Sequence, residues 1–321
     1  MTGGPLWISD AEVERLLDPR DLIAAVEAGF AAVGRGDLGE AGSTRLDGLD
    51  GAGAYLTLYP AHDRSGFASV KLLAGRPANA DEGRPEIDAV VALVEPRAGR
   101  GAALISARAL TALRTAAATV AALRRLAPRG PCRIGLVGAG GQARAHARVL
   151  AAAGLAESFC IASPRGEAAR AATAAEAIAA TTGVATRAVE TGAIGGGSDI
   201  VILMTLARTP VAIGALAPDA VLASIGPFYP QAQELDPAVV ARAAFVVSDD
   251  PARLARQWAG STTLDVAALA PAALADLIAG RVAPRAGLRV FLSDGRAFQD
   301  NVAASLVYAT ARRAGRGLEL P

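Results

Sequence analysis

RIGLVGAGGQA, residues 133–143, is the stretch that decides the fold of this 321-residue chain. A short Val/Ile/Leu run, typical of a buried parallel strand, leads into closely spaced glycines, and the Ala-rich residues 144–153 favour a helix. Gly138 permits a sharp turn, Gly140 lets a pyrophosphate approach the backbone, and Ala143 allows helix and strand to pack closely. The stretch therefore predicts a dinucleotide-binding turn at a helix N-terminus. The alternative is a glycine-rich turn in an ordinary α/β domain.

The segments around this turn alternate between strand-like and helix-like patterns. Ala-rich helical stretches separate several of the apolar runs, which predicts a doubly wound parallel sheet. The strand-like runs are residues 133–138, 157–163, 184–189, 199–205, 220–226, 243–249 and 288–294. We therefore expect an α/β fold with a Rossmann dinucleotide-binding domain over residues 128–292.

The two ends of the chain follow a different pattern. Residues 1–127 combine a helical stretch, short strand-like runs between residues 42 and 95, and a long helix from residue 104 that ends before Pro128. A closing amphipathic helix follows residue 294. We expect this helix to return to the first block, so that residues 1–127 and 293–321 form one α+β domain.

Composition narrows the function classes. A net charge of +1 gives no electrostatic reason to expect nucleic acid or a membrane surface as a partner. No run approaches the roughly 20 apolar residues that a membrane span needs, and the N-terminus does not resemble a signal peptide. Two cysteines and two histidines lack metal-ligand spacing, so we expect buried free thiols at Cys132 and Cys160 and no metal. A cytoplasmic protein is expected.

Lys71 is the only lysine among 32 basic residues, which makes it informative in an arginine-rich chain. At a surface position arginine would serve equally well, but a lysine ammonium lowers its pKa on burial and can then deliver or accept a proton. Lys71 lies in the apolar, strand-like run FASVKLL. We interpret it as a functional residue, with a chance survivor of biased composition as the alternative.

The end of the second strand-like run of the Rossmann domain bears on the choice of dinucleotide. An acidic residue there holds the ribose 2′-hydroxyl in NAD-selective folds. Ser163 occupies that place in CIASPRG, and Arg165 follows it. Because no carboxylate repels a 2′-phosphate and an arginine can bind it, we expect NADP(H) in preference to NAD(H). The alternative is that Arg165 is a solvated residue in the first turn of the next helix.

The motif LTALRTAAAT at residues 110–119 resembles the ornithine cyclodeaminase/mu-crystallin family, especially its ketimine and pyrroline-2-carboxylate reductase-like members. Further family-like motifs occur in the same order along most of the chain. These are STRL, VKLL, Asn79 with Gly83 and Pro85, VGAGGQA, IGPFYPQAQELDP and LSDGRAFQD. The resemblance implies a two-domain homodimer, with substrate binding and dimerisation in the domain built from both termini. It also implies a site between the domains and chemistry on the α-carbon of an amino or imino acid.

The resemblance also implies roles for individual residues. Arg45 and Arg114 would bind the substrate carboxylate, with Lys71 as the neighbouring cation, and two arginines on one carboxylate give charge-assisted bonds of fixed orientation. Surface positions in an arginine-rich chain are the alternative for both arginines. The implied cofactor-binding residues are Arg114, Thr115, Gly138, Gly140, Gly141, Gln142, Ala143, Ser163, Arg165, Thr205, Ser224, Gly226 and Ser293.

The sequence departs from the family pattern at three places. Phe228 stands where lyase members carry an aspartate needed for ammonia loss, and a phenyl ring can neither activate water nor take a proton. Glu86 replaces a frequent threonine near the nicotinamide, and Asp294 replaces an apolar residue that faces the substrate side chain. We expect Glu86, Phe228 and Tyr229 to shape the substrate pocket. Tyr229 and Asp294 are reserve candidates for the proton donor.

These features together predict an enzyme of amino-acid metabolism that uses NADPH to reduce the C=N bond of a 2-imino acid. The substrate would be a cyclic ketimine such as pyrroline- or piperideine-2-carboxylate, or an open-chain imine. Three alternatives stay open. They are an amino-acid dehydrogenase or biosynthetic condensing enzyme, a cyclodeaminase-type lyase, and a non-catalytic NADPH-dependent binder like mu-crystallin.

Overall fold

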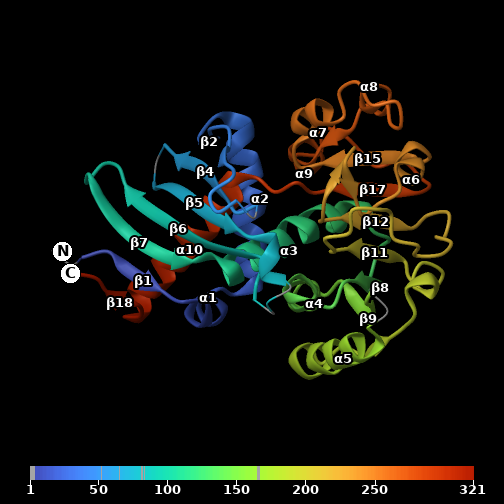
Figure 1. Cartoon of the computed structure of the whole chain (residues 1–321), viewed down its shortest axis with the longest axis horizontal. Coiled ribbons are helices and arrows are strands. Elements are labelled where there is room, and N and C mark those ends of the chain that lie inside the picture. The colour runs from blue at the N-terminus through green and yellow to red at the C-terminus, as the bar shows by residue number, and fades with distance from the viewer. Residues whose placement is uncertain (1–3, 52, 65, 81, 83, 165–166) are drawn as a thin grey trace. The chain divides into compact units, whose positions relative to one another are not determined.

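The computed structural model describes residues 4–51, 53–64, 66–80, 82, 84–164 and 167–321, and it divides into two compact units (Figure 1). Unit 1 comprises Met1–Arg114 and Arg296–Pro321, and unit 2 comprises Thr115–Gly295. Both termini therefore belong to unit 1. The domain boundaries expected after residues 127 and 292 stay a prediction.

Unit 1 is built on one mixed sheet with the strand order β18-β1-β7-β6-β5-β4-β2, and β3 also pairs with β4. Among the strand pairs that the described residues form in this sheet, only β1–β7 is parallel. Its elements are β1 (Leu6–Ile8), α1 (Asp10–Leu16), α2 (Pro19–Arg35), β2 (Leu38–Glu40), β3 (Thr44–Leu46), β4 (Tyr55–Asp63), β5 (Ala68–Gly75), the 3-10 turn η1 (Pro77–Ala80), β6 (Ile87–Glu95), β7 (Arg100–Ser106), the first turns of α3 (Ala107–Leu126), α10 (Ala297–Ala314) and β18 (Leu318–Glu319). Residues 104–106, expected to begin the long helix, end β7 instead.

Local sequence explains where the helices of unit 1 begin and end. Ser9 and Glu12 form a reciprocal capping box at the start of α1. Asp18 caps α2, whose first residue is Pro19, and α2 ends at Gly36 in the left-handed conformation. Glu40 contacts the start of α10, where it accepts a hydrogen bond from the backbone N–H of Phe298 at 3.2 Å. These contacts fix where α1, α2 and α10 begin and where α2 ends.

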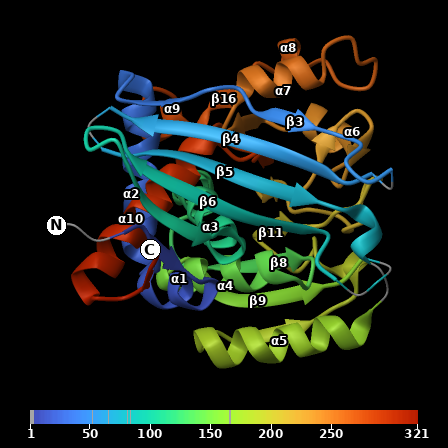
Figure 2. The same ribbon diagram turned by 60° about the vertical axis from the view of Figure 1, so that its left-hand side comes forward.

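The two faces of the unit 1 sheet differ in burial. Helix α10 packs against β4, β5 and β6, with α2 beside it (Figure 2). Lys71 lies on this covered face, because its ammonium contacts Asp300 of α10. Strand side chains alternate between faces, so Val70 points to the other face. The strand register places Ala92, Leu104, Trp7 and Leu318 in line with Val70, and all five side chains are half-buried or exposed. We call them the outer apolar row.

Unit 2 contains an eight-stranded parallel sheet in the order β10-β9-β8-β11-β12-β17-β15-β16. Its elements are the remainder of α3, β8 (Cys132–Val137), α4 (Gly141–Ala152), β9 (Ala156–Ala162), α5 (Ala168–Thr182), β10 (Thr186–Ala188), η2 (Thr191–Ala193), β11 (Ile200–Leu203), β12 (Val221–Ser224), β13 (Phe228–Tyr229), β14 (Ala232–Gln233), α6 (Pro237–Ala241), β15 (Phe245–Ser248), α7 (Pro251–Gln257), α8 (Val266–Leu269), β16 (Ala272–Ala273), α9 (Leu274–Ile278) and β17 (Arg289–Leu292). The first five strands have the order 3-2-1-4-5 of a Rossmann fold. The predicted fold class is confirmed.

The core of unit 2 follows from composition. Strands β8, β11, β12 and β17 are almost wholly buried and rich in Val, Ile, Leu, Ala and Phe, as expected for a parallel sheet with helices on its faces. Cys132 and Cys160 are both buried in this sheet. Among the described residues, no helix is both long enough and apolar enough to cross a bilayer.

Candidate functional site

Lys71 and Arg114 meet at one buried carboxylate in unit 1. Lys71 extends from β5 and its Nζ lies 2.7 Å from Oδ2 of Asp300, while Arg114 extends from α3 and its Nε donates to Oδ1 of Asp300 at 2.8 Å. Nη1 of Arg114 also donates to Oε1 of Gln299 at 2.6 Å. All four side chains are buried. We call Lys71, Arg114, Gln299 and Asp300 the cation cluster; it fixes the orientation of both cations.

Burial and charge set the protonation behaviour of the cation cluster. Burial lowers the pKa of Lys71 to about 8; Asp300 opposes this shift and Arg114 adds to it. Burial alone would raise the pKa of Asp300, but Arg114 and Lys71 outweigh it and hold that pKa below its usual range. The carboxylate therefore stays ionised at neutral pH, and the ammonium loses its proton far more readily than a surface lysine does. A lysine with these properties can act as a proton donor.

Arg45 shares the covered sheet face with Lys71 but does not join the cation cluster in the contacts of the structure. On β3 it stands opposite Thr57 of β4, and Lys71 on β5 stands opposite Tyr59 of β4, one position further along the same face. The Arg45 guanidinium stacks 3.6 Å from the Tyr55 ring centroid and donates to Asp47 at 2.8 Å. Its side chain is 49% exposed.

The start of α4 in unit 2 fits a dinucleotide pyrophosphate. Gly138 adopts φ +118°, which favours glycine, and a Cβ there would lie 2.7 Å from the carbonyl oxygen of Met204. Gly140 is the N-cap of α4 and has no side-chain cap, and a Cβ at Gly140 or Gly141 would enter open space. The first backbone N–H groups of this twelve-residue helix thus face an open approach, which suits an anion.

Two hollows lie beyond the glycine turn, at the carboxyl ends of neighbouring strands of unit 2. One, of about 290 Å³, is lined by Ser163, Ala168, Ala171, Ala188, Val189, Glu190 and Thr191. The other, of about 320 Å³, is lined by Pro164, Thr191, Thr205, Leu206, Ala207, Thr209, Pro210, Val211 and Ala212. Ser163 and Thr205, expected to contact the cofactor, therefore each line a hollow at the edge where such sheets bind ligands. Arg165 lies outside the described residues.

Glu234 is a buried carboxylate that the sequence did not single out. Its Oε2 accepts from the backbone N–H and the hydroxyl of Thr205 at 2.6 and 2.8 Å. Its Oε1 accepts from the hydroxyl of Ser224 at 2.9 Å, and from the backbone N–H groups of Ile225 and Gly226 at 3.2 and 2.7 Å. Three expected cofactor-binding residues, Thr205, Ser224 and Gly226, are thus held by one side chain.

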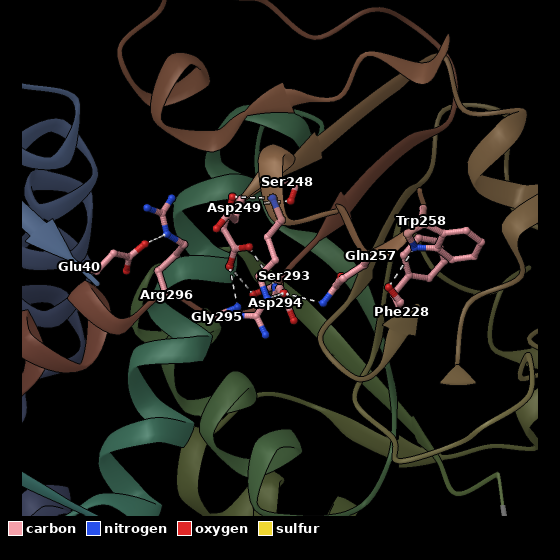
Figure 3. Close-up of polar contacts among 12 residues, drawn as sticks. Glu40, Phe228, Ser248, Asp249, Gln257, Trp258, Ser293, Asp294, Gly295 and Arg296 are labelled. Atoms are coloured by element: carbon pink, nitrogen blue, oxygen red, sulfur yellow. Dashed lines mark hydrogen bonds and ion pairs between the residues drawn. The ribbon is translucent and has the colours of Figure 1, made fainter. Parts of the chain in front are cut away.

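A second buried carboxylate, Asp249, organises the residues that follow β17 (Figure 3). It accepts from the Ser293 hydroxyl at 2.9 Å and from the backbone N–H groups of Asp294 and Gly295, each at 3.0 Å. The Asp294 carboxylate contacts Arg253 and accepts from Gln257 at 3.2 Å. Partial burial raises the pKa of Asp294 to about 6; Arg253 opposes this shift and Asp249 adds to it. Asp294 can therefore exchange a proton near neutral pH.

The other expected site residues lie in varied surroundings. Phe228 is buried, with its ring centroid 4.9 Å from that of Trp258, whose indole N–H donates to the Phe228 carbonyl (Figure 3). Tyr229 is 38% exposed, and Glu86 is half-buried just before β6. Thr115 is buried, and the Gln142 carbonyl contacts the buried ring of His146 at 2.9 Å. The assignment of these residues to the substrate pocket or to the cofactor stays a prediction.

Asp300, Gln299, Glu234 and Asp249 are the polar residues that sequence reasoning missed. Asp300 and Gln299 belong to LSDGRAFQD, and Glu234 belongs to IGPFYPQAQELDP. Of the acidic and amide residues in these two motifs, the sequence indicated a role for Asp294 alone. No local pattern marks the three carboxylates. Glu234 stands two residues before Asp236, Asp249 stands next to Asp250, and Asp300 lies between Gln299 and Asn301, so their need for partners appears only once the fold buries them.

Comparison with known proteins places the chain in a family. The model of the ornithine cyclodeaminase/mu-crystallin family matches residues 6–315. Delta(1)-pyrroline-2-carboxylate reductase 2 of Burkholderia ambifaria is 31% identical over 320 residues, which cover 96% of each chain. Iminosuccinate reductase of Paracoccus denitrificans is 30% identical over 247 residues, which cover 74% of each chain.

Solved structures agree with the family match. Delta(1)-pyrroline-2-carboxylate reductase of Thermococcus litoralis, in complex with NADH and L-proline, superposes with a TM-score of 0.88 at 25% identity, and covers 98% of this chain and all of that one. An archaeal alanine dehydrogenase dimer with bound NAD superposes with a TM-score of 0.84 at 25% identity over 99% of each chain. The resemblance that LTALRTAAAT and the later motifs carried is confirmed. The chain belongs to the ornithine cyclodeaminase/mu-crystallin family.

Proposed function

We propose that this protein is an NAD(P)H-dependent reductase of the C=N bond of a 2-imino acid, either a cyclic ketimine of the pyrroline- or piperideine-2-carboxylate type or an open-chain imine. The cation cluster is the observation that carries the proposal, because it holds an oriented guanidinium and a proton-donating ammonium side by side. Reductases of pyrroline-2-carboxylate and of iminosuccinate among the relatives support it. The glycine turn before α4 supports the dinucleotide.

Each cation has a part in the proposed reaction. Arg114, with Arg45 from the same sheet face as Lys71, binds the substrate carboxylate through charge-assisted hydrogen bonds and so orients the imine. Lys71 donates a proton to the imine nitrogen, directly or through a water, and Asp300 keeps its ammonium in place. A reduced nicotinamide, when bound, supplies hydride to the C=N carbon, so proton and hydride together convert imine to amine. Orientation supplies much of the rate of such a reaction.

The neighbourhood of Phe228 favours reduction over deamination. The ring is packed against Trp258, and the side chain offers no carboxylate for activating water or accepting a proton. A lyase of the cyclodeaminase type would need such a group. Phe228 is therefore the specific reason for ranking the lyase below the reductase.

A substrate panel separates the reductase from its alternatives. We would follow reduced-nicotinamide absorbance and ammonia with cyclic ketimines, with 2-oxo acids plus amines, and with ornithine. The proposal predicts cofactor oxidation with the preformed ketimines. Turnover only with a 2-oxo acid and ammonia or an amine would identify a dehydrogenase or condensing enzyme. Ammonia release from ornithine without net cofactor change would identify the lyase, and binding without turnover would identify the binder.

We propose further that NADP(H) is preferred over NAD(H), because Ser163 rather than an acid follows β9 and Arg165 is available in sequence to bind a 2′-phosphate. Ser163→Asp should lower the affinity ratio of NADPH to NADH by roughly tenfold or more, since a carboxylate would repel the phosphate. Ser163→Ala is the matched control and should leave the ratio nearly unchanged. Glu190 lines the hollow of about 290 Å³ together with Ser163, and its carboxylate is the feature that favours NADH. Tighter binding of NADH than NADPH by the wild type in titration calorimetry would refute the preference.

A homodimer is proposed on the basis of the outer apolar row of unit 1. Leu318 is 64% exposed and Leu104 is 37% exposed on the sheet face opposite α10. In a dimer, the outer apolar rows of the two copies would cover each other. The dimeric archaeal relative supports this choice of partner. Light scattering should give a mass of two chains, and Leu104→Lys should lower it to one. A wild-type mass of one chain at working concentration would contradict the proposal.

A further inference from the structure

Glu234 receives more hydrogen bonds than a carboxylate needs for structural satisfaction alone, and its donors come from two separate places in the chain. Thr205 follows β11, whereas Ser224, Ile225 and Gly226 end or follow β12. Five donors converge on two oxygens that are fully buried. Burial raises the pKa of Glu234, and the hydrogen bonds from Thr205, Gly226 and Ser224 oppose that shift. Because every neighbour donates, the arrangement suits the ionised carboxylate.

The direction of these hydrogen bonds fixes what the two hydroxyl groups can offer a ligand. A hydroxyl has one hydrogen and two lone pairs. Thr205 gives its hydrogen to Glu234 and accepts at 3.1 Å from the backbone N–H of Ala207, and Ser224 also gives its hydrogen to Glu234. For a further hydrogen bond, each hydroxyl oxygen therefore has only a lone pair to offer. Ser224 is only 1% exposed, so the half-buried Thr205 hydroxyl is the one that can present a lone pair to a ligand, and it suits a ligand N–H better than an anion.

Gly226 is an independent sign that the carboxylate must occupy this place. A Cβ on Gly226 would lie 2.3 Å from the carbonyl oxygen of Thr205, and 2.6 Å from Cδ and Oε2 of Glu234. Only glycine leaves room for the carboxylate to reach the backbone N–H groups that follow β12. The loop is thus shaped around Glu234.

The strand order indicates which part of a dinucleotide lies near the Thr205 hydroxyl. In a sheet of this order the glycine turn after β8 and the end of β9 bind the adenosine half, and the strands beyond the switch point bind the other nucleotide. Strands β11 and β12 lie beyond that point, next to β8 in the order β8-β11-β12. Thr205 and Ala207 line the hollow of about 320 Å³, which extends from Pro164 and Thr191, after β9 and β10, to the residues that follow β11. The N–H donor of a nicotinamide is its carboxamide NH₂.

We propose that Glu234 is a positioning residue for the nicotinamide half of the cofactor: by consuming the hydrogen of the Thr205 hydroxyl, it makes that oxygen an acceptor for the carboxamide NH₂. This rests only on dinucleotide binding, and it stands whether or not an imino acid is the substrate. The adenosine half and the pyrophosphate should be indifferent to Glu234.

Binding calorimetry with three ligands tests the proposal without any turnover. The ligands are NAD⁺, its 3-acetylpyridine analogue, which lacks the NH₂ donor, and ADP-ribose, which lacks the nicotinamide; the 2′-phosphorylated set is used if the wild type binds it more tightly. The wild type should prefer NAD⁺ over the analogue by roughly tenfold, the value of one lost hydrogen bond. Glu234→Gln should reduce that preference to about twofold or less and leave ADP-ribose affinity within about twofold, because an amide NH₂ beside Thr205 donates to its hydroxyl oxygen and frees the hydroxyl hydrogen to point at the ligand.

Two further variants keep the test decisive. Asp236→Asn, on an exposed helix cap two residues away, loses the same charge and should preserve the preference for NAD⁺ over the analogue. If Glu234→Gln does not fold, Thr205→Val removes the acceptor and leaves Glu234 four of its five donors; it should still lower the preference by about threefold or more. Equal weakening of NAD⁺, analogue and ADP-ribose would show a merely structural residue. A preference unchanged in Glu234→Gln, or absent in the wild type, would overturn the proposal.

Discussion

Replacing Lys71 by alanine should lower kcat for a cyclic 2-imino acid by about 100-fold or more, the usual contribution of a positioned general acid. The ammonium is buried against Asp300 and has no second lysine to replace it. Dinucleotide affinity, measured by quenching of protein fluorescence, should stay within about twofold of the wild type, because Lys71 lies in unit 1 and the glycine turn lies in unit 2. Turnover of Lys71→Ala equal to that of the wild type would show that Lys71 is not the proton donor.

The pH profile separates proton donation by Lys71 from simple charge. The active form is the protonated ammonium, and its pKa is lowered to about 8, so kcat/KM of the wild type should fall as the pH rises through about 8. Lys71→Arg keeps the positive charge but cannot lose a proton in this range, so its residual activity should lack that alkaline limb. Arg100→Ala removes an exposed cation from the same sheet and should keep the wild-type profile.

Replacing Asp300 by alanine should destabilise the protein by about 3–5 kcal/mol, the cost of removing one partner from a buried ion pair. The change leaves both Lys71 and Arg114 buried without their shared carboxylate. Urea denaturation at pH 7 measures the loss. Folding lowers the pKa of Asp300 from its ordinary value of 3.8. The stabilisation is therefore fully present above the unfolded pKa and is lost as the pH falls through the folded pKa.

Two companion variants show whether the loss comes from the buried charges. Asp37→Ala removes an exposed carboxylate that pairs with Arg35 and should cost less than about 1 kcal/mol. Adding Lys71→Met to Asp300→Ala removes one stranded cation and should recover part of the stability without recovering activity. A loss for Asp300→Ala no larger than that for Asp37→Ala would contradict the account of the cation cluster.

The fold was largely predictable because its deciding features are local. The glycine turn and the continuous apolar runs placed β8, β9, β11, β12, β15 and β17 to within a few residues of the structure. The insertion of β17 between β12 and β15 was not predictable, because strand order depends on long-range pairing that no local pattern encodes. The two-residue strand β16 carries too little periodicity to be recognised.

Of the cation cluster, the sequence singled out Lys71 and Arg114 but not Asp300, and the roles of the two cations stay predictions. Lys71 was conspicuous because it is the only lysine, and Arg114 because of the motif around it. Asp300 acquires its role only when folding brings it to Arg114, 186 residues away in sequence. Glu234 likewise depends on donors from two strand ends. A buried carboxylate is defined by its donors, and a single sequence does not show which donors the fold will bring to it.

Transfer of deuterium to the product from a reduced cofactor that carries deuterium at both C4 positions is the most direct test of imine reduction. With piperideine-2-carboxylate as substrate in ordinary water, the account predicts a product amino acid one mass unit heavier, with the label on its α-carbon. An unlabelled product, or ammonia released from an amino acid while the label returns to the dinucleotide, would contradict it.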